Sequence, residues 1–201
     1  MLVRGKDVQP PGAQRDKCTL RNHPYVEGYG PKQADVVLCG EAPGPTEARR
    51  GLPFVGRSGQ LLDAVLQDVG LEREELFVTN ACLCAPEPIR APTTKELRAC
   101  RTRLLQTVKA RKPKVVVAMG NTALKAITDR HGISNWQGAP IWSEELQTVV
   151  VPSFHPAAVL RSPRRYQDLK TALKKAVSVL KGEIAPAPPT GADVDTVIIQ
   201  D

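Results

Sequence analysis

The residues best suited to chemistry fall in two loops, each following a short apolar run. The first loop covers residues 40–56 and is rich in glycine and proline, with Glu41, Glu47 and Phe54 among them. Glycine and proline favour a tight backbone turn, which could close around a planar ligand. An ordinary Gly/Pro-rich surface loop would show the same composition. Because the G-x-x-x-x-G-K-[ST] pattern is missing, the sequence does not support a Walker-type phosphate site.

The second loop covers residues 152–161 and contains His155. A histidine after a strand can donate a hydrogen bond to a developing negative charge. We expect Val159 and Leu160 to be exposed apolar residues beside arginines. Such apolar side chains can wedge into a duplex while the arginines hold its backbone. The alternative is that these apolar residues simply reach the core. The apolar and basic residues concerned are Val159, Leu160, Arg161, Arg164 and Arg165.

A third position is Asn80, at the end of the apolar run 76–79. Its amide offers both a donor and an acceptor, which is enough to read one edge of a base. Asparagine is also a common turn former, so the residue by itself supports either interpretation.

The elements that must position these residues alternate along the chain. Short, bounded apolar runs predict strands at 35–39, 76–79, 114–119 and 147–151. Helices are predicted from Ser58 to a stop at Gly70, from the capping box Thr93–Glu96 through Val108, over 121–129, and from Ser162-Pro163 through Leu180. This alternation predicts a three-layer α/β/α fold with a central four-stranded, mostly parallel sheet. Ligands bind such sheets at the carboxyl ends of the strands.

Composition narrows the function classes. The 201 residues include 28 Lys+Arg against 21 Asp+Glu, a formal net charge of +7, and 41% are hydrophobic. The length and the hydrophobic share are typical of one globular domain. The positive net charge suits a polyanionic partner. The apolar runs are far shorter than the ~18 residues of a spanning helix, and the start has no apolar h-region. We therefore expect a cytoplasmic or nucleoid protein with no membrane partner.

The ends of the chain differ from its middle. Residues 1–17 are polar and read as a flexible arm, and 182–201 form a Pro/Ala-rich tail or linker. The domain is predicted to cover 18–181. The tail is a candidate contact for a replication or repair partner, and we expect a monomer.

The two loops, together with Asn80, resemble the uracil-DNA glycosylase superfamily and are most similar to its iron–sulfur family 4. The resemblance rests on GEAPG and GLPFVGRSGQLLD (40–44 and 51–63), TNACLC and PTTKELRAC (79–84 and 92–100), and SFHPAAVLR (153–161). It covers roughly residues 18–180. It implies a four-stranded parallel sheet between helices, and an enzyme that flips uracil out of DNA and hydrolyses its N-glycosidic bond.

The resemblance also implies roles for individual residues. Phe54 would stack on the flipped base, Asn80 would read the uracil edge, and Glu47 would crowd the methyl group of thymine. Gly40 and Ala42 would belong to the same substrate site. The implied catalytic residues are Glu41 and His155.

Those two residues would act on opposite charges. His155 would stabilise the uracil anion as a neutral donor, while Glu41 would place the water or balance the oxocarbenium-like sugar. A sister group traps uracil covalently through a histidine in a basic insertion after the first motif. That insertion is absent between Arg49 and Phe54, so we expect ordinary turnover.

The five cysteines, at 18, 39, 82, 84 and 100, are odd in number and do not predict a disulfide framework. The resemblance implies a [4Fe–4S] cluster, with Cys18, Cys84 and Cys100 at three ligand positions and Arg15 at the first. Three alternatives follow: a replacement ligand, a three-cysteine cluster with an open site, or thiols that are only structural. The candidate replacements are Cys82, Asp16 and His23, and Cys39 is expected to be a buried small hydrophobe.

Two other functions fit the same resemblance. One is a catalytically reduced DNA-binding module that assists replication. The other is a glycosylase for a different deaminated base.

Overall fold

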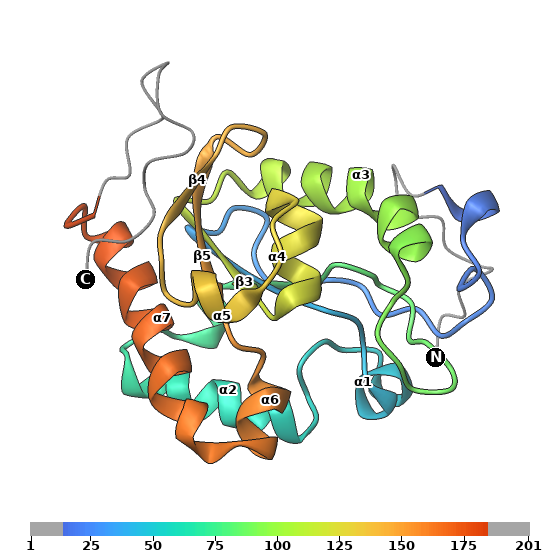
Figure 1. Cartoon of the computed structure of the whole chain (residues 1–201), viewed down its shortest axis with the longest axis horizontal. Coiled ribbons are helices and arrows are strands. Elements are labelled where there is room, and N and C mark those ends of the chain that lie inside the picture. Colours follow the sequence, from blue (N-terminus) through green and yellow to red (C-terminus); the bar gives the residue numbers. More distant parts are fainter. Residues whose placement is uncertain (1–13, 185–201) are drawn as a thin grey trace.

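A computed structural model describes residues 14–184, which form three α/β/α layers (Figure 1). The central sheet has the strand order β2-β1-β3-β5-β4. Its members are β1 (Val36–Gly40), β2 (Phe77–Asn80), β3 (Val115–Met119), β4 (Ile141–Ser143) and β5 (Thr148–Ser153). Residues 1–13 of the predicted arm and 185–201 of the predicted tail lie outside the described residues.

Four of these strands are parallel, as predicted from their apolar runs. The fifth corrects the predicted count, because β4 pairs antiparallel with β5 at the sheet edge. Its three residues, Ile141–Ser143, are too few to show a strand period in the sequence. A turn closes the hairpin, with Gln147 at φ 53° and its N–H donating to the carbonyl oxygen of Ser143 at 2.7 Å.

Seven helices flank the sheet in the described part of the chain. They are α1 (Pro45–Arg50), α2 (Arg57–Asp68), α3 (Thr94–Arg111), α4 (Asn121–Thr128), α5 (Ile133–Trp136), α6 (Pro156–Arg161) and α7 (Tyr166–Leu180). Short 3-10 turns are η1 (Arg15–Lys17), η2 (Arg73–Glu75) and η3 (Pro163–Arg165). Among these residues, no helix combines the length and the apolarity needed to cross a membrane.

The two faces of the sheet bury two separate apolar clusters. Helices α2 and α7 cover one face and α3 and α4 the other (Figure 1). Alternate residues of a strand supply opposite faces, so Leu38 packs with Leu62 and Leu169, whereas Val37 packs with Leu104. This double coverage explains why the strands read as continuous apolar runs.

The helix starts confirm one prediction and correct two. The capping box of α3 is present: the Glu96 N–H donates to Thr93 Oγ1 at 3.3 Å, and the Thr93 N–H donates to Glu96 Oε2 at 2.7 Å. However, Gly56 and not Ser58 caps α2. The last α-helix begins at Tyr166, because the chain from Pro163 first makes the 3-10 turn η3.

Two helices occur inside segments interpreted as loops. Helices α1 and α6 begin at Pro45 and Pro156, where proline's fixed φ suits a first helical residue. Each helix has only six residues, which is too short for a periodic apolar pattern. Both helices nevertheless set the directions of side chains in the site.

Candidate active site

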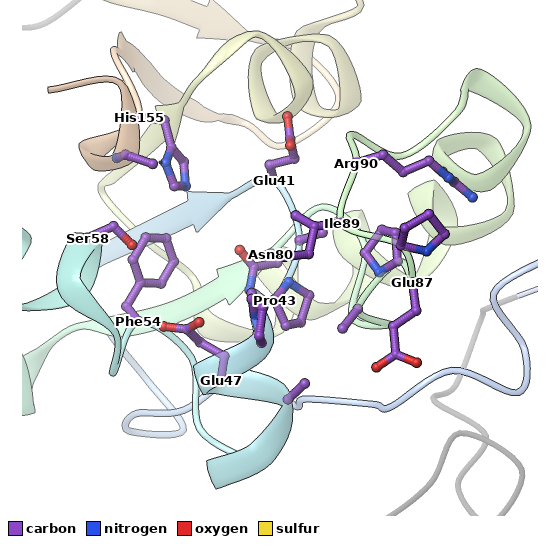
Figure 2. Close-up of a pocket in the computed structure, with 18 of the residues that line it drawn as sticks. Glu41, Pro43, Glu47, Phe54, Ser58, Asn80, Glu87, Ile89, Arg90 and His155 are labelled. Atoms are coloured by element: carbon purple, nitrogen blue, oxygen red, sulfur yellow. Dashed lines mark hydrogen bonds between the residues drawn. The ribbon is translucent and has the colours of Figure 1, made fainter. Parts of the chain in front are cut away.

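A cavity of about 400 Å³ opens at the carboxyl ends of β1, β2 and β5, where parallel sheets bind ligands. It brings together most of the predicted site residues: Glu41, Ala42, Glu47, Phe54, Asn80, His155 and Arg161. Figure 2 shows Phe54 and His155 on one side, Ile89 and Arg90 on the other, and Asn80 and Glu41 between them.

Gly40, the last residue of β1, does not itself line the cavity, but Asn80 and Phe54 approach closely there. A Cβ atom at Gly40 would lie 2.5 Å from Asn80 Oδ1 and 2.5 Å from Phe54 Cζ. Both distances are far inside van der Waals contact, so a side chain here would push the amide or the ring out of place. Glycine is therefore needed at this position.

Phe54 is the aromatic wall of the cavity and is held in an unusual backbone conformation. Its φ is 54°, and its side chain is buried against the core. Glu47 Oε1 accepts hydrogen bonds from the N–H groups of Val55, at 3.0 Å, and Gly56, at 2.7 Å. In the structure, Glu47 thus holds the loop that carries Phe54.

Arg73 braces the same loop from outside the cavity, a contact that the sequence motifs do not reveal. Its Nη2 donates to the carbonyl oxygens of Pro53, at 2.9 Å, and Phe54, at 3.1 Å, and its guanidinium pairs with Asp63. A Cβ atom at Gly59 would lie 1.8 Å from the Phe54 oxygen, so α2 passes directly against this loop. Both features hold the backbone of Phe54 in place.

Asn80 presents a buried amide to the cavity from the last position of β2. The residue is 2% exposed, and its Oδ1 has no hydrogen-bond partner among the described residues. Its main-chain oxygen accepts a hydrogen bond from Arg103 Nη2 at 3.0 Å. A buried oxygen without a partner costs about 1–3 kcal/mol, which a ligand N–H at this point would recover.

His155 caps α6, and its tautomer follows from that role. Nδ1 accepts a hydrogen bond from the Ala157 N–H at 3.1 Å, so the ring proton of the neutral form lies on Nε2. Burial, assisted by the positive charge of Arg161, lowers the pKa of His155 to about 4. The ring is therefore a neutral donor at pH 7. Its centroid lies 5.7 Å from that of Phe54.

Gly120 allows His155 to sit this close to the end of β3. Its φ is 90°, and a Cβ atom would lie 3.2 Å from the Cβ of His155. No sequence motif marks Gly120, because an isolated glycine after a strand has many explanations.

Glu41 follows β1 directly and is held from two sides. The Thr122 hydroxyl on α4 donates to its carboxylate, and its main-chain oxygen accepts from the Cys82 N–H at 3.0 Å. Glu41 is held in this way while it lines the cavity. Thr122 is another contact that only the folded chain reveals.

The far rim of the cavity is the segment Ala85–Arg90, which the sequence analysis missed. Ile89 is 75% exposed there, so it faces both the cavity and solvent. Arg90 ties the segment to buried Glu96 through two hydrogen bonds of 2.8 Å, and the Thr19 hydroxyl donates to the same carboxylate. Chiefly because of the Arg90 hydrogen bonds, the pKa of Glu96 falls to about 2. The ion pair of Arg90 with Glu96 thus anchors the rim to helix α3.

The five predicted DNA-contacting residues lie in different environments. Val159 was expected to be exposed but is only 3% exposed and packs in the core, because α6 turns it inward. Leu160, on the outer side, is 40% exposed, and Arg161 lines the cavity. Arg164 and Arg165 do not line the cavity, and the Arg165 guanidinium lies 4.5 Å from the Phe154 ring centroid.

Four of the thiols lie near the start of α3. Cys18 and Cys84 pack around Ala99, and Cys82 and Cys100 form a hydrogen-bonded pair. This hydrogen bond and the Arg103 guanidinium lower the pKa of Cys100 to about 6, while the hydrogen bond and burial raise that of Cys82 well above its ordinary value.

The described thiols do not form a metal-ligand group in this structure. In residues 14–184, no three His, Cys, Asp or Glu side chains are placed to hold a metal ion together. His23, one candidate ligand, instead accepts a hydrogen bond at Nδ1 from the Glu87 N–H at 3.2 Å, and Asp16 is exposed. The described residues therefore show no formed four-ligand site, and the [4Fe–4S] cluster implied by the resemblance stays a prediction. Cys39 is buried, as predicted, and burial raises its pKa to about 12.

Comparison with known proteins bears on this geometry. The family model of the uracil DNA glycosylase superfamily matches residues 27–181. The chain is 36% identical over 179 residues to a type-4 uracil-DNA glycosylase of Thermotoga maritima, covering 83% of this chain and 91% of that protein. The corresponding protein of Archaeoglobus fulgidus is 34% identical over 170 residues, or 79% and 84%.

A third relative is of another kind. A DNA polymerase of Bacillus phage SP01 is 27% identical over 174 residues, which is 86% of this chain but 18% of the polymerase. The family match covers all the elements that build the cavity, from β1 to α6. By the match to the family model and the identity to the type-4 relatives, this chain belongs to the uracil-DNA glycosylase superfamily.

Proposed function

We propose that this chain removes uracil from DNA by hydrolysing the N-glycosidic bond, leaving an abasic site. The observation that carries the proposal is the buried, unpartnered Oδ1 of Asn80 in the same cavity as the Phe54 ring and the neutral ring of His155. A base reaches such a cavity only after it has left the stack.

Recognition of uracil follows from the amide. The N3–H of uracil would donate to Asn80 Oδ1, while its O4 would accept from the amide N–H. Cytosine has an acceptor at N3 and a donor at position 4, so both contacts would fail. Phe54 supplies a face for stacking, and Glu47 contributes by holding that face in place.

Cleavage leaves negative charge on uracil and positive charge on the sugar. His155 would act on the first charge and Glu41 on the second. As the bond from C1′ to N1 breaks, its electron pair stays on uracil and the sugar becomes oxocarbenium-like. His155 Nε2–H would donate to the uracil oxygen that gains negative charge, with no proton transfer needed. Water then adds to C1′ and releases a proton, which the uracil anion takes up directly or through solvent. The Glu41 carboxylate, held by Thr122, would stabilise the cationic sugar and orient that water.

The cysteines take no part in these steps. The residues with assigned roles line the cavity at the strand ends, whereas Cys18 and Cys100 pack at the start of α3. No step of the proposed reaction uses a cluster.

The test is uracil release from a labelled oligonucleotide, followed by alkaline cleavage of the abasic sites. We expect release by the wild-type chain and a loss of about 10²–10³-fold in rate for His155→Ala, the size typical of losing one such donor. The matched control is His131→Ala, an exposed histidine outside the cavity. Folded protein that releases no uracil at high concentration would contradict the proposal.

A second candidate is a DNA-binding module that assists replication, because the chain also matches a segment of a phage DNA polymerase. The two candidates differ in one readout. A binding module would hold DNA in a salt-dependent way, release no base, and lose nothing on His155→Ala.

A further inference from the structure

A second cavity, of about 330 Å³, lies on the opposite face of β2 from the site. It is lined by the segment Tyr25–Gly30, strand β2, Leu83 and helix α3. Thr79 lines this cavity and Asn80 lines the first, because neighbouring strand residues point to opposite faces. No residue lines both cavities.

Arg103 enters this cavity with donors to spare. The residue is 2% exposed, and its Nη2 donates to the carbonyl oxygens of Asn80, at 3.0 Å, and Ala81, at 2.8 Å. Its Nε and Nη1 are buried with no hydrogen-bond partner in the described chain. Burying part of a charged guanidinium in this state is costly, so an acceptor that fills the cavity would be stabilising.

Two neighbours add donors. The Arg111 guanidinium lies 4.0 Å from the Phe77 ring centroid, which fixes its orientation, and its Nε is also buried without a partner among the described residues. The Thr79 hydroxyl oxygen is likewise buried and has no hydrogen-bond partner among the described residues. The anionic neighbour of Arg103 is the Cys100 thiol, which forms a hydrogen bond with it and whose pKa it helps to lower to about 6. No carboxylate of residues 14–184 forms an ion pair with Arg103 or Arg111. Glu27 lines the cavity but is exposed.

We propose that this cavity binds a small phosphate-bearing anion, held by Arg103, Arg111 and the Thr79 hydroxyl. Planar guanidinium groups match the oxygen geometry of phosphate, and hydrogen bonds to charged groups are the stronger ones. The volume of about 330 Å³ lies within the range of small-molecule sites, roughly 300–1,000 Å³. The ligand is a free molecule, because a phosphate in a DNA backbone would have to enter the cavity to meet a side chain that is 2% exposed.

Calorimetric titration of the full chain with inorganic phosphate tests the proposal, with sodium chloride at matched ionic strength as the blank. Arg103 is left in place, because its Nη2 holds two carbonyl oxygens at the end of β2. Thr79→Val keeps the side-chain shape, and Arg111→Gln removes one charge. We expect saturable binding to the wild-type chain and a loss of roughly 10-fold or more for each variant, the size of one hydrogen bond to a charged group.

Two further variants make the result specific. Glu27→Gln removes the carboxylate at the cavity and should tighten phosphate binding. Arg98→Gln makes the same charge change as Arg111→Gln on the same helix, at an exposed position lining neither cavity, and should leave the affinity unchanged. Circular dichroism confirms that each variant is folded.

Several outcomes would overturn the proposal. They are no saturable phosphate binding by the wild-type chain, equal losses in Arg98→Gln and Arg111→Gln, and affinity unchanged in Thr79→Val. Binding abolished by Arg161→Gln would place the phosphate in the first cavity instead. Displacement of phosphate by a uracil-free single-stranded oligonucleotide, with the same dependence on Thr79, would show that the source is DNA. None of these readouts depends on uracil release.

Discussion

At the scale of single residues, His155 ties the chemistry of the site to the stability of the fold. Its folded pKa, about 4, lies below the value of about 6.5 for an unperturbed histidine. The unfolded chain therefore takes up this proton first as the pH falls. The stability associated with neutral His155 is fully present above pH ~6.5 and is lost progressively as the pH falls towards 4.

A denaturation series at pH 7 and pH 5 measures this effect. We expect His155 to account for a loss of about 2 kcal/mol in the free energy of unfolding between these values. His155→Gln, which cannot take up the proton, should lose less by that amount. Equal losses in the two proteins would show that His155 titrates normally. Uracil release should, for the same reason, retain its rate well below pH 6.5.

The Asn80 amide should contribute to uracil release and not to the stability of the fold. Asn80→Ala removes both contacts to the uracil edge, so we expect kcat/KM for uracil release to fall about 10- to 100-fold, as for one or two hydrogen bonds. The same change removes a buried oxygen that has no partner in the described chain, so the melting temperature should not fall. Asn135→Ala, at an exposed position on α5, is the control. A large loss of stability would show that the amide has a structural role.

At the scale of elements, the loop between α1 and α2 depends on one carboxylate. Glu47→Ala frees the N–H groups of Val55 and Gly56, so we expect the free energy of unfolding to fall by about 1–3 kcal/mol. Because Phe54 moves with the loop, kcat/KM should fall as well. Glu47→Gln keeps an acceptor oxygen and should restore part of both losses. Discrimination against thymine tests the other predicted role, crowding of its methyl group.

The rim segment Ala85–Arg90 gives a prediction of its own. Ile89 is exposed at the cavity, where an apolar side chain can pack against the DNA beside a flipped nucleotide. Ile89→Ala should weaken binding to uracil-containing duplex several-fold, measured by fluorescence anisotropy, and leave the melting temperature unchanged. Tyr29→Ala removes an exposed side chain outside the cavity and is the control. Equal affinity of Ile89→Ala and wild type would exclude the rim as a DNA contact.

At the scale of the whole molecule, the thiols and the catalytic cavity are separate parts of the fold. The cavity-lining residues come from the strand ends and the adjacent loops, and no cysteine is among them. We therefore expect treatment with an iron chelator under reducing conditions to leave the rate of uracil release unchanged. An absorption spectrum and iron analysis of the anaerobically purified sample accompany the assay. Loss of release together with loss of iron would contradict this separation.

Sequence alone determined the elements with strong local patterns. The four parallel strands are continuous apolar runs because both faces of each are buried, and the α3 capping box lies wholly within Thr93–Glu96. The strand order in turn brings Glu41, Asn80 and His155 to one edge, because carboxyl ends of parallel strands meet there. Fold class and most of the site were therefore predictable.

Tertiary structure decided what depends on contacts between distant segments. Whether Val159 or Leu160 faced the core depended on how α6 packs, and the three-residue strand β4 exists only because β5 offers an edge. The low pKa of His155 and the donors left over on Arg103 come from burial, which no local spacing encodes. Local patterns fix the backbone conformation of a segment, whereas desolvation and pairing are set by what the rest of the chain places around it.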